Sequence, residues 1–200
     1  GAKEYGIQCY IKHFALNDSE INRSSMLCTW CNEQAMREIY LKSFEMSVKI
    51  GGADNVMTAF NYIGNVWAGA CEELLQTVLR DEWGFVGSTV SDWFHGTDDG
   101  YMLADSAIRV GGDKMLSSSG DTKAFVSDTS DANTVIAMRN AAHNILYSLA
   151  NSSAMDERNF STPGWVTAFY AVDAVVSVLL VAGEAYLIIR FLKKRKANAA

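Results

Sequence analysis

Segments typical of β-strands and of α-helices alternate four times along the first 150 residues. The first strand segment places Ile7, Cys9 and Ile11 in alternation, and the helical segments are rich in helix-forming residues. We expect strands at 6–13, 55–60, 87–92 and 113–116, and helices at 32–50, 72–81, 101–110 and 132–150. Such alternation favours a parallel sheet with right-handed crossovers. A closed eight-unit barrel takes roughly 250 residues. Four units therefore predict an α/β fold equivalent to half a barrel.

Polar residues gather where the expected strands end. Lys12 and His13 end the first strand, Asn61 follows the second, and Asp92 ends the third. In parallel α/β sheets the functional side chains collect at the carboxyl ends of the strands. The sequence therefore predicts a polar site at this edge of the sheet.

The charge balance and the cysteines narrow the classes of function. The chain has 17 basic and 23 acidic residues and a net charge of -6, which argues against nucleic-acid binding. Its four cysteines are too few for a disulfide scaffold. Cys28 and Cys31 form a C-x-x-C pair, but no second pair or histidine stands at zinc spacing. A disulfide or two loop thiols is favoured there over a metal site.

The C-terminal region predicts a membrane span. Residues 165–189 contain only two charged side chains, and about 20 apolar residues suffice to cross a bilayer. Aromatic residues begin this segment, and the basic residues of 190–200 follow it. By the positive-inside rule we expect a cell-membrane helix with a cytoplasmic basic tail and everything before it extracellular. The polar segment 151–164, which holds the only proline, is the expected linker.

The two charged residues of the span are Asp173 and Glu184. They stand close to three helical turns apart, so they share one face of the helix. Each costs about 2.5–3.5 kcal/mol near the centre of a bilayer. That face would meet a partner helix or a water-filled cavity. The alternative is a buried or surface-lying helix of a soluble protein.

Three segments, in this order, carry a resemblance to a known family. They are Lys12-His13-Phe14 with Asn17, Asp18 and Arg23; residues 56–61 (VMTAFN); and residues 79–85 (LRDEWGF) followed by 90–93 (VSDW). The chain resembles glycoside hydrolase family 3, in its β-glucosidase-like form, over roughly residues 6–116. In that family these segments belong to the C-terminal half of a (β/α)8 TIM barrel. The expected architecture is therefore a half-barrel over 1–150 followed by one transmembrane helix.

The resemblance implies a retaining, exo-acting hydrolysis of β-linked terminal sugars. Asp92 would be the nucleophile and form a covalent glycosyl-enzyme. Lys12, His13 and Arg23 would bind the sugar hydroxyls, and the two cationic side chains would also favour the ionised carboxylate. Trp93 would offer its ring face to the sugar. This chemistry implies a carbohydrate substrate and neither a metal nor an organic cofactor.

The sequence also departs from the family pattern. Phe60 stands where many members have a tyrosine that hydrogen-bonds near the nucleophile. The glycine-rich loop of the N-acetylglucosamine-removing branch is absent, which favours β-glucosidase-type or β-xylosidase-type specificity. The first half of the barrel and the acid/base domain are expected upstream or from another chain.

Other interpretations remain open. For Asp92 alone the alternative is a residue that caps the following loop, and Lys12 or Arg23 have Asp18 and Glu20 as candidate ion-pair partners. At the level of function, the first alternative is a non-catalytic, membrane-bound sugar-binding relative of the same fold. The second is a structural membrane subunit, which the acidic face of the span suggests.

Overall fold

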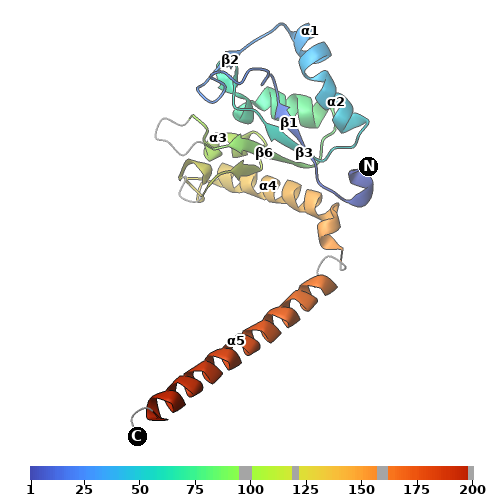
Figure 1. The fold of residues 1–200 in the computed structure, drawn as a ribbon. Coiled ribbons are helices and arrows are strands. Elements are labelled where there is room, and N and C mark those ends of the chain that lie inside the picture. The colour runs from blue at the N-terminus through green and yellow to red at the C-terminus, as the bar shows by residue number, and fades with distance from the viewer. Residues whose placement is uncertain (95–100, 119–121, 157–161, 198–200) are drawn as a thin grey trace. The chain divides into compact units, whose positions relative to one another are not determined.

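The computed structural model describes residues 1–94, 101–118, 122–156 and 162–197. It divides into two compact units, Gly1–Met155 and Asp156–Ala200 (Figure 1). Residues 157–161 of the predicted linker and 198–200 of the predicted tail lie outside the described residues.

A four-stranded parallel sheet organises the first unit. Its strands are β1 (Tyr10–Phe14), β3 (Asn55–Thr58), β6 (Ser88–Trp93) and β7 (Lys114–Leu116), in the order β1-β3-β6-β7. Neighbours in this order are also consecutive strands of the predicted alternation, which confirms the α/β fold class. Every other strand boundary lies within two residues of the expected one, but the first strand begins at Tyr10 and not at the expected Gly6.

The late start of β1 has a physical reason. Residues Lys3–Tyr5 form a short helical turn, η1, and Gly6 ends it in the left-handed region at φ 67°. Glycine adopts this conformation without a steric penalty. The carbonyl oxygen of Gly6 then accepts a hydrogen bond from the Ser153 amide at 2.8 Å, so it is engaged by a distant segment and not by a neighbouring strand.

Helices follow the strands as predicted. Their bounds are α1 (Glu33–Ala35), η2 (Met36–Tyr40), α2 (Lys42–Lys49), η4 (Glu73–Glu82), α3 (Ala104–Arg109) and α4 (Ala132–Ala150), with single turns η3 (Ala68–Ala70), η5 (Thr122–Ala124) and η6 (Ser153–Met155). Side chains cap two of them: Asn32 accepts from the Ala35 amide at 2.8 Å, and Asp131 accepts from the Thr134 amide at 2.8 Å. Such caps satisfy amides that have no partner within the helix.

The main core lies between the sheet and helices α2 and η4. Phe14 of β1 is fully buried, and its ring packs against Phe44 at 5.0 Å and Trp83 at 5.8 Å between centroids. Leu75 and Leu79 of η4 are fully buried in the same cluster. The apolar faces of α2 and η4 thus pack against the sheet, and the two helices form the layer that covers it.

A second, smaller sheet was not predicted. It joins β2 (Cys28–Thr29), β4 (Tyr62–Ile63) and β5 (Val66–Trp67), in the order β2-β4-β5. Strands of two residues carry no alternation that a sequence pattern can reveal. All four cysteines are free thiols, so the C-x-x-C pair is not a disulfide here.

Helix α4 lies across the amino ends of the parallel strands. Asn144 donates to Asp113 before β7 at 2.9 Å, and the Ser148 hydroxyl accepts from the Ser88 amide of β6 at 3.0 Å. The same hydroxyl donates to the carbonyl of Asp54, before β3, at 3.3 Å. This helix therefore closes the end of the sheet opposite to the carboxyl end of β6.

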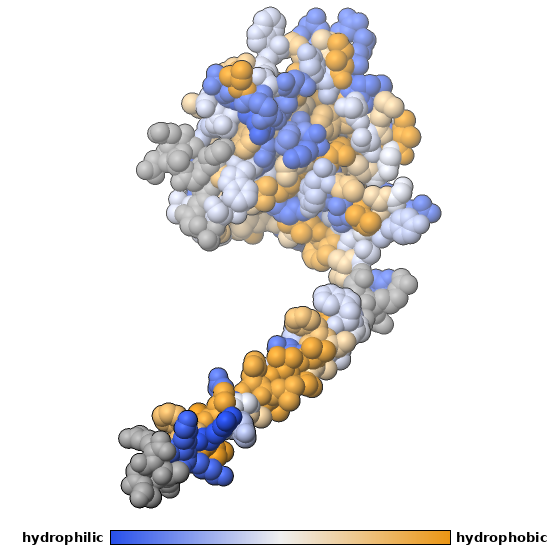
Figure 2. All heavy atoms as spheres, in the orientation of Figure 1, coloured by the Kyte–Doolittle hydropathy of each residue, from blue (hydrophilic) through white to orange (hydrophobic). Residues whose placement is uncertain are grey.

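The second unit contains one long helix, α5 (Gly164–Ala197). Apolar side chains cover most of its length, and hydrophilic ones gather toward its C-terminal end (Figure 2). Residues Gly164–Lys194 are long and apolar enough to cross a membrane, and none of the apolar stretch is buried. The expected apolar helix at 165–189 is thus present as part of a longer one.

We predict that Asp113→Ala strongly destabilises the first unit. The Asp113 side chain is only 1% exposed; it accepts from the Thr89 amide at 2.7 Å and pairs with Arg80 at 3.0 Å. Removing it leaves a buried guanidinium without its counter-charge, which costs about 3–5 kcal/mol. Urea unfolding of the natively expressed protein measures the loss.

The matched control is Glu33→Ala. Its carboxylate is 80% exposed and pairs with Arg37, so its removal should cost less than about 1 kcal/mol. Equal destabilisation by the two variants would contradict the structural role of Asp113.

Candidate active site

The carboxylate of Asp92 lies at the carboxyl end of β6 and is almost buried, with 8% of the residue exposed. Its Oδ1 accepts a hydrogen bond from the Trp93 backbone amide at 2.7 Å. Its Oδ2 lies 3.2 Å from His13 Nε2 and 3.6 Å from Arg23 Nη1. No hydrogen bond from another described residue reaches Oδ2. One oxygen is therefore fixed by the backbone and the other faces two nitrogen-bearing side chains.

His13 reaches this carboxylate from β1, on the far side of β3 in the sheet order. The peptide bonds Lys12–His13 and Phe14–Ala15 are cis. Burial lowers the pKa of His13, and the facing Asp92 carboxylate opposes that shift while the cationic Lys12 and Arg23 add to it. The lowered pKa of His13 favours the neutral imidazole, and with it a polar contact to Asp92 over a full ion pair.

Arg23 comes from the loop between β1 and β2. Asn22 precedes it in the left-handed region at φ 61°, a conformation that asparagine tolerates better than most residues. The Arg23 guanidinium pairs through Nε with Glu20 at 2.8 Å and lies 4.9 Å from the centroid of the Phe60 ring. Arg23 thus both pairs with Glu20, as one interpretation of the sequence had it, and reaches the site.

Two other predicted site residues lie further out. Lys12 is exposed and forms no ion pair with any described residue. Trp93 is 45% exposed at the end of β6. The structure thus brings His13, Arg23 and Asp92 together, while sugar binding by Lys12 and Trp93 stays a prediction.

Sequence reasoning missed two aromatic residues beside the site. Trp67 Nε1 donates to the Ala59 carbonyl at 2.9 Å, and the Tyr101 hydroxyl donates to the Phe60 carbonyl at 2.7 Å. Tyr101 and Phe60 are 41 residues apart, so no local pattern links them.

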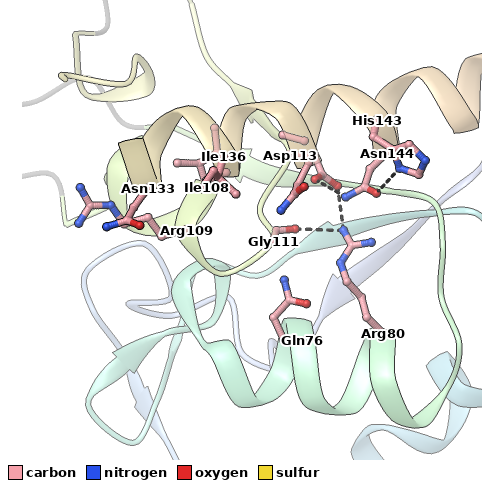
Figure 3. A pocket seen from close by; sticks show the side chains of 13 residues that line it. Gln76, Arg80, Ile108, Arg109, Gly111, Asp113, Asn133, Ile136, His143 and Asn144 are labelled. Carbon is pink, nitrogen blue, oxygen red and sulfur yellow. Dashed lines mark hydrogen bonds and ion pairs between the residues drawn. The ribbon is translucent and has the colours of Figure 1, made fainter. Parts of the chain in front are cut away.

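A separate pocket of about 510 Å³ lies between η4, α3 and α4. Figure 3 shows Arg80, Gly111, Asp113 and Asn144 hydrogen-bonded at its centre. These polar groups already bind one another, so we assign them to stability. Within the ranges that the structure describes, no group of three histidine, cysteine or carboxylate residues is placed to hold a metal ion.

The fold of the first unit and the side chains at the carboxyl edge of its sheet together identify a class of protein domain. Consecutive strand–helix units with parallel strands, and an acid, a histidine and an arginine at the carboxyl edge, are features of (β/α)-barrel-type domains. The chain belongs to glycoside hydrolase family 3, since the model of the glycosyl hydrolase family 3 N-terminal domain matches residues 1–136. This confirms the family that the motifs indicated.

Individual relatives that resemble this chain are named beta-glucosidases. A beta-glucosidase of Rhizobium radiobacter is 43% identical over 94 residues, which is 47% of this chain and 11% of the relative. A beta-glucosidase of Ruminococcus albus is 37% identical over 99 residues, 50% of this chain and 10% of the relative. The chain spans about a tenth of the length of these curated relatives.

Solved structures show the same fold. The beta-glucosidase of Bifidobacterium adolescentis superposes with a TM-score of 0.67 at 27% identity, over 77% of this chain and 22% of that one. Beta-glucosidase 3B of Thermotoga neapolitana, in complex with glucose, superposes with a TM-score of 0.62 at 29% identity, over 81% and 23%.

The lowered pKa of His13 predicts a pH-dependent stability. Between the folded-state pKa and the ordinary value of 6.5, the unfolded chain binds more protons than the folded one. The free energy of unfolding should therefore rise with pH across the window just below 6.5 and level off above it. Urea unfolding at several pH values, for the wild type and for His13→Gln, measures this.

His13→Gln should flatten the rise in that window, because it removes the titrating imidazole. The control His143→Gln removes an exposed histidine of α4 and should keep the wild-type slope. A slope that survives His13→Gln would overturn the assignment.

Proposed function

We propose that this chain carries the nucleophile of a retaining, exo-acting β-glucosidase-type or β-xylosidase-type hydrolase. Asp92 would attack the anomeric carbon and form a glycosyl-enzyme that water then hydrolyses. The supporting observation is the state of its carboxylate. Oδ1 is fixed by the Trp93 amide, and the buried Oδ2 accepts no hydrogen bond from a described residue. That oxygen retains a lone pair for attack.

The neighbouring side chains fit sugar recognition. Arg23 Nη1 is buried and has no hydrogen-bond partner in the described part of the chain, so it has donor capacity left for a sugar hydroxyl. The two ring nitrogens of His13 offer a donor and an acceptor when the imidazole is neutral, the form that burial favours. In this proposal Lys12 adds a further donor and Trp93 a ring face at the exposed rim.

A retaining glycosidase of this fold requires further strands and a second, acid/base carboxylate. Among the residues that the structure describes, β1 and β7 are the edges of the four-stranded sheet and pair on one side only. Barrels close such edges. We therefore propose that the remaining strands and the acid/base carboxylate come from an upstream segment or from another chain.

A second candidate is a non-catalytic sugar-binding relative. It is favoured by Phe60, which offers no hydroxyl where many family members have a tyrosine, and whose ring instead carries the Arg23 guanidinium. Sugar binding alone would use the same histidine and arginine.

Asp92→Asn should reduce kcat on an aryl β-glucoside at least about a thousandfold, because the amide is a poor nucleophile. A fluorinated, activated glucoside that forms a slowly released intermediate should label Asp92, as peptide mass spectrometry would show. Both the turnover assay and the labelling experiment use the protein as its own host expresses it. The control Asp81→Asn alters an exposed carboxylate of η4 and should leave kcat unchanged.

Near-normal turnover in Asp92→Asn would rule out the nucleophile role. Glucose binding without turnover in the wild-type protein would favour the second candidate.

We further propose that α5 anchors the protein in the cell membrane, with the first unit extracellular and the basic tail cytoplasmic. The support is the length and apolar surface of Gly164–Lys194 and the basic residues that follow the apolar run. Asp173 and Glu184 would then face protein or water rather than lipid.

The anchor predicts resistance to alkaline carbonate extraction. The wild-type protein should stay in the membrane pellet, and a variant without residues 164–197 should appear in the supernatant, because it has lost the apolar segment. A wild-type protein released by carbonate would contradict a membrane span and support the surface-lying helix.

A further inference from the structure

Two aromatic side chains hold the chain just after β3. Trp67 Nε1 donates to the carbonyl of Ala59 at 2.9 Å, and the Tyr101 hydroxyl donates to the carbonyl of Phe60 at 2.7 Å. The two rings also contact each other edge to face, with centroids 6.3 Å apart. Two consecutive carbonyls are therefore fixed by donors that belong to different segments.

The residue held in this way supports the arginine of the site. Phe60 is only 4% exposed, and its ring lies under the Arg23 guanidinium at 4.9 Å. Outside the site, that guanidinium also contacts Glu20, whose carboxylate is 81% exposed. Exposed ion pairs contribute little. The ring of Phe60 is thus the more rigid of the two supports.

We propose that Tyr101 is a positioning residue that holds Arg23 against Asp92 through Phe60. The inference rests on the proposed function and adds to it a residue from the segment between β6 and α3. The path runs from the phenol to the Phe60 backbone, from the Phe60 ring to Arg23, and from Arg23 Nη1 to Asp92 Oδ2 at 3.6 Å.

The chemistry of the phenol suits this role. Burial raises the pKa of Tyr101, and the neighbouring Tyr62 and Asp92 raise it further. The hydroxyl thus stays protonated and keeps donating at every pH at which a glycosidase is assayed. Its ring packs on Tyr62 at 5.2 Å, so the donor sits on a fixed aromatic support.

A double-mutant cycle tests the path. Tyr101→Phe keeps the ring and removes only the hydroxyl. It should lower kcat/KM on an aryl β-glucoside about tenfold in the wild-type background, the size of one lost hydrogen bond. In the Arg23→Ala background it should change kcat/KM by no more than about twofold, because the side chain it positions is gone. Tyr147→Phe, a partly exposed tyrosine of α4, is the matched control and should change neither value.

Equal losses in the two backgrounds would mean that Tyr101 acts on stability alone and would overturn the proposal, as would the absence of any loss. If Tyr101→Phe fails to fold, by circular dichroism, Trp67→Phe removes the neighbouring donor and should show the same dependence on Arg23. Glucose affinity, measured by calorimetry for the same four proteins, separates the two hypotheses. A coupling seen in affinity but without turnover in the wild type would retain the role of Tyr101 and reject the hydrolase.

Discussion

The parallel pairing of β1, β3, β6 and β7 is the constraint on which the rest of the first unit depends. Because all four strands run in one direction, every carboxyl end reaches the same edge, and this brings His13 of β1 within 3.2 Å of Asp92 of β6. The amino ends meet at the opposite edge, where α4 binds them through Asn144 and Ser148. A shift of one residue in the pairing of β6 would turn Asp92 to the other face of the sheet. The register Met57–Val90 is therefore as important to the site as the acid itself.

Two aspartates at opposite ends of this sheet show how surroundings decide the role of one residue type. Asp113 receives hydrogen bonds from the Thr89 amide, Arg80 and Asn144, on both of its oxygens. Both of its oxygens are engaged by the protein, so it ties β6 and β7 to η4 and α4, and we assign it to stability. Asp92 is nearly as buried, but its Oδ2 is only flanked by His13 and Arg23. A buried carboxylate oxygen without a hydrogen bond costs free energy in the folded protein. This cost is the reason to propose that the reaction takes place at Asp92.

Local patterns accounted for the elements better than for the contacts of the site. Helix α4 spans Ala132–Ala150 as expected, since Asp131 caps its start and apolar positions recur along it. The apolar alternation predicts a first strand that begins four residues too early, because it reveals neither the left-handed Gly6 nor the contact of Gly6 with Ser153. At the site, His13 and Asp92 stand at the carboxyl ends of two expected parallel strands, and this position predicts that they lie close together. The support of Arg23 by Phe60 and Tyr101 was not predictable, because it joins loops that only the folded sheet brings into contact.

Arg23 contacts residues of the site and of its surroundings, and the shape of its guanidinium explains why a lysine would not make the same contacts. The guanidinium uses Nε for the exposed Glu20, one planar face for the Phe60 ring, and an edge for Asp92. A lysine ammonium has neither a planar face nor a fork of donors, so it would satisfy one of these neighbours at a time. Glu20 alone would draw such a flexible cation outward into solvent, where ion pairs are weak. The flat contact with Phe60 opposes this and keeps the charge at the carboxylate. A phenylalanine at position 60 is consistent with this contact, because the ring packs against the Arg23 guanidinium and needs no hydroxyl to do so.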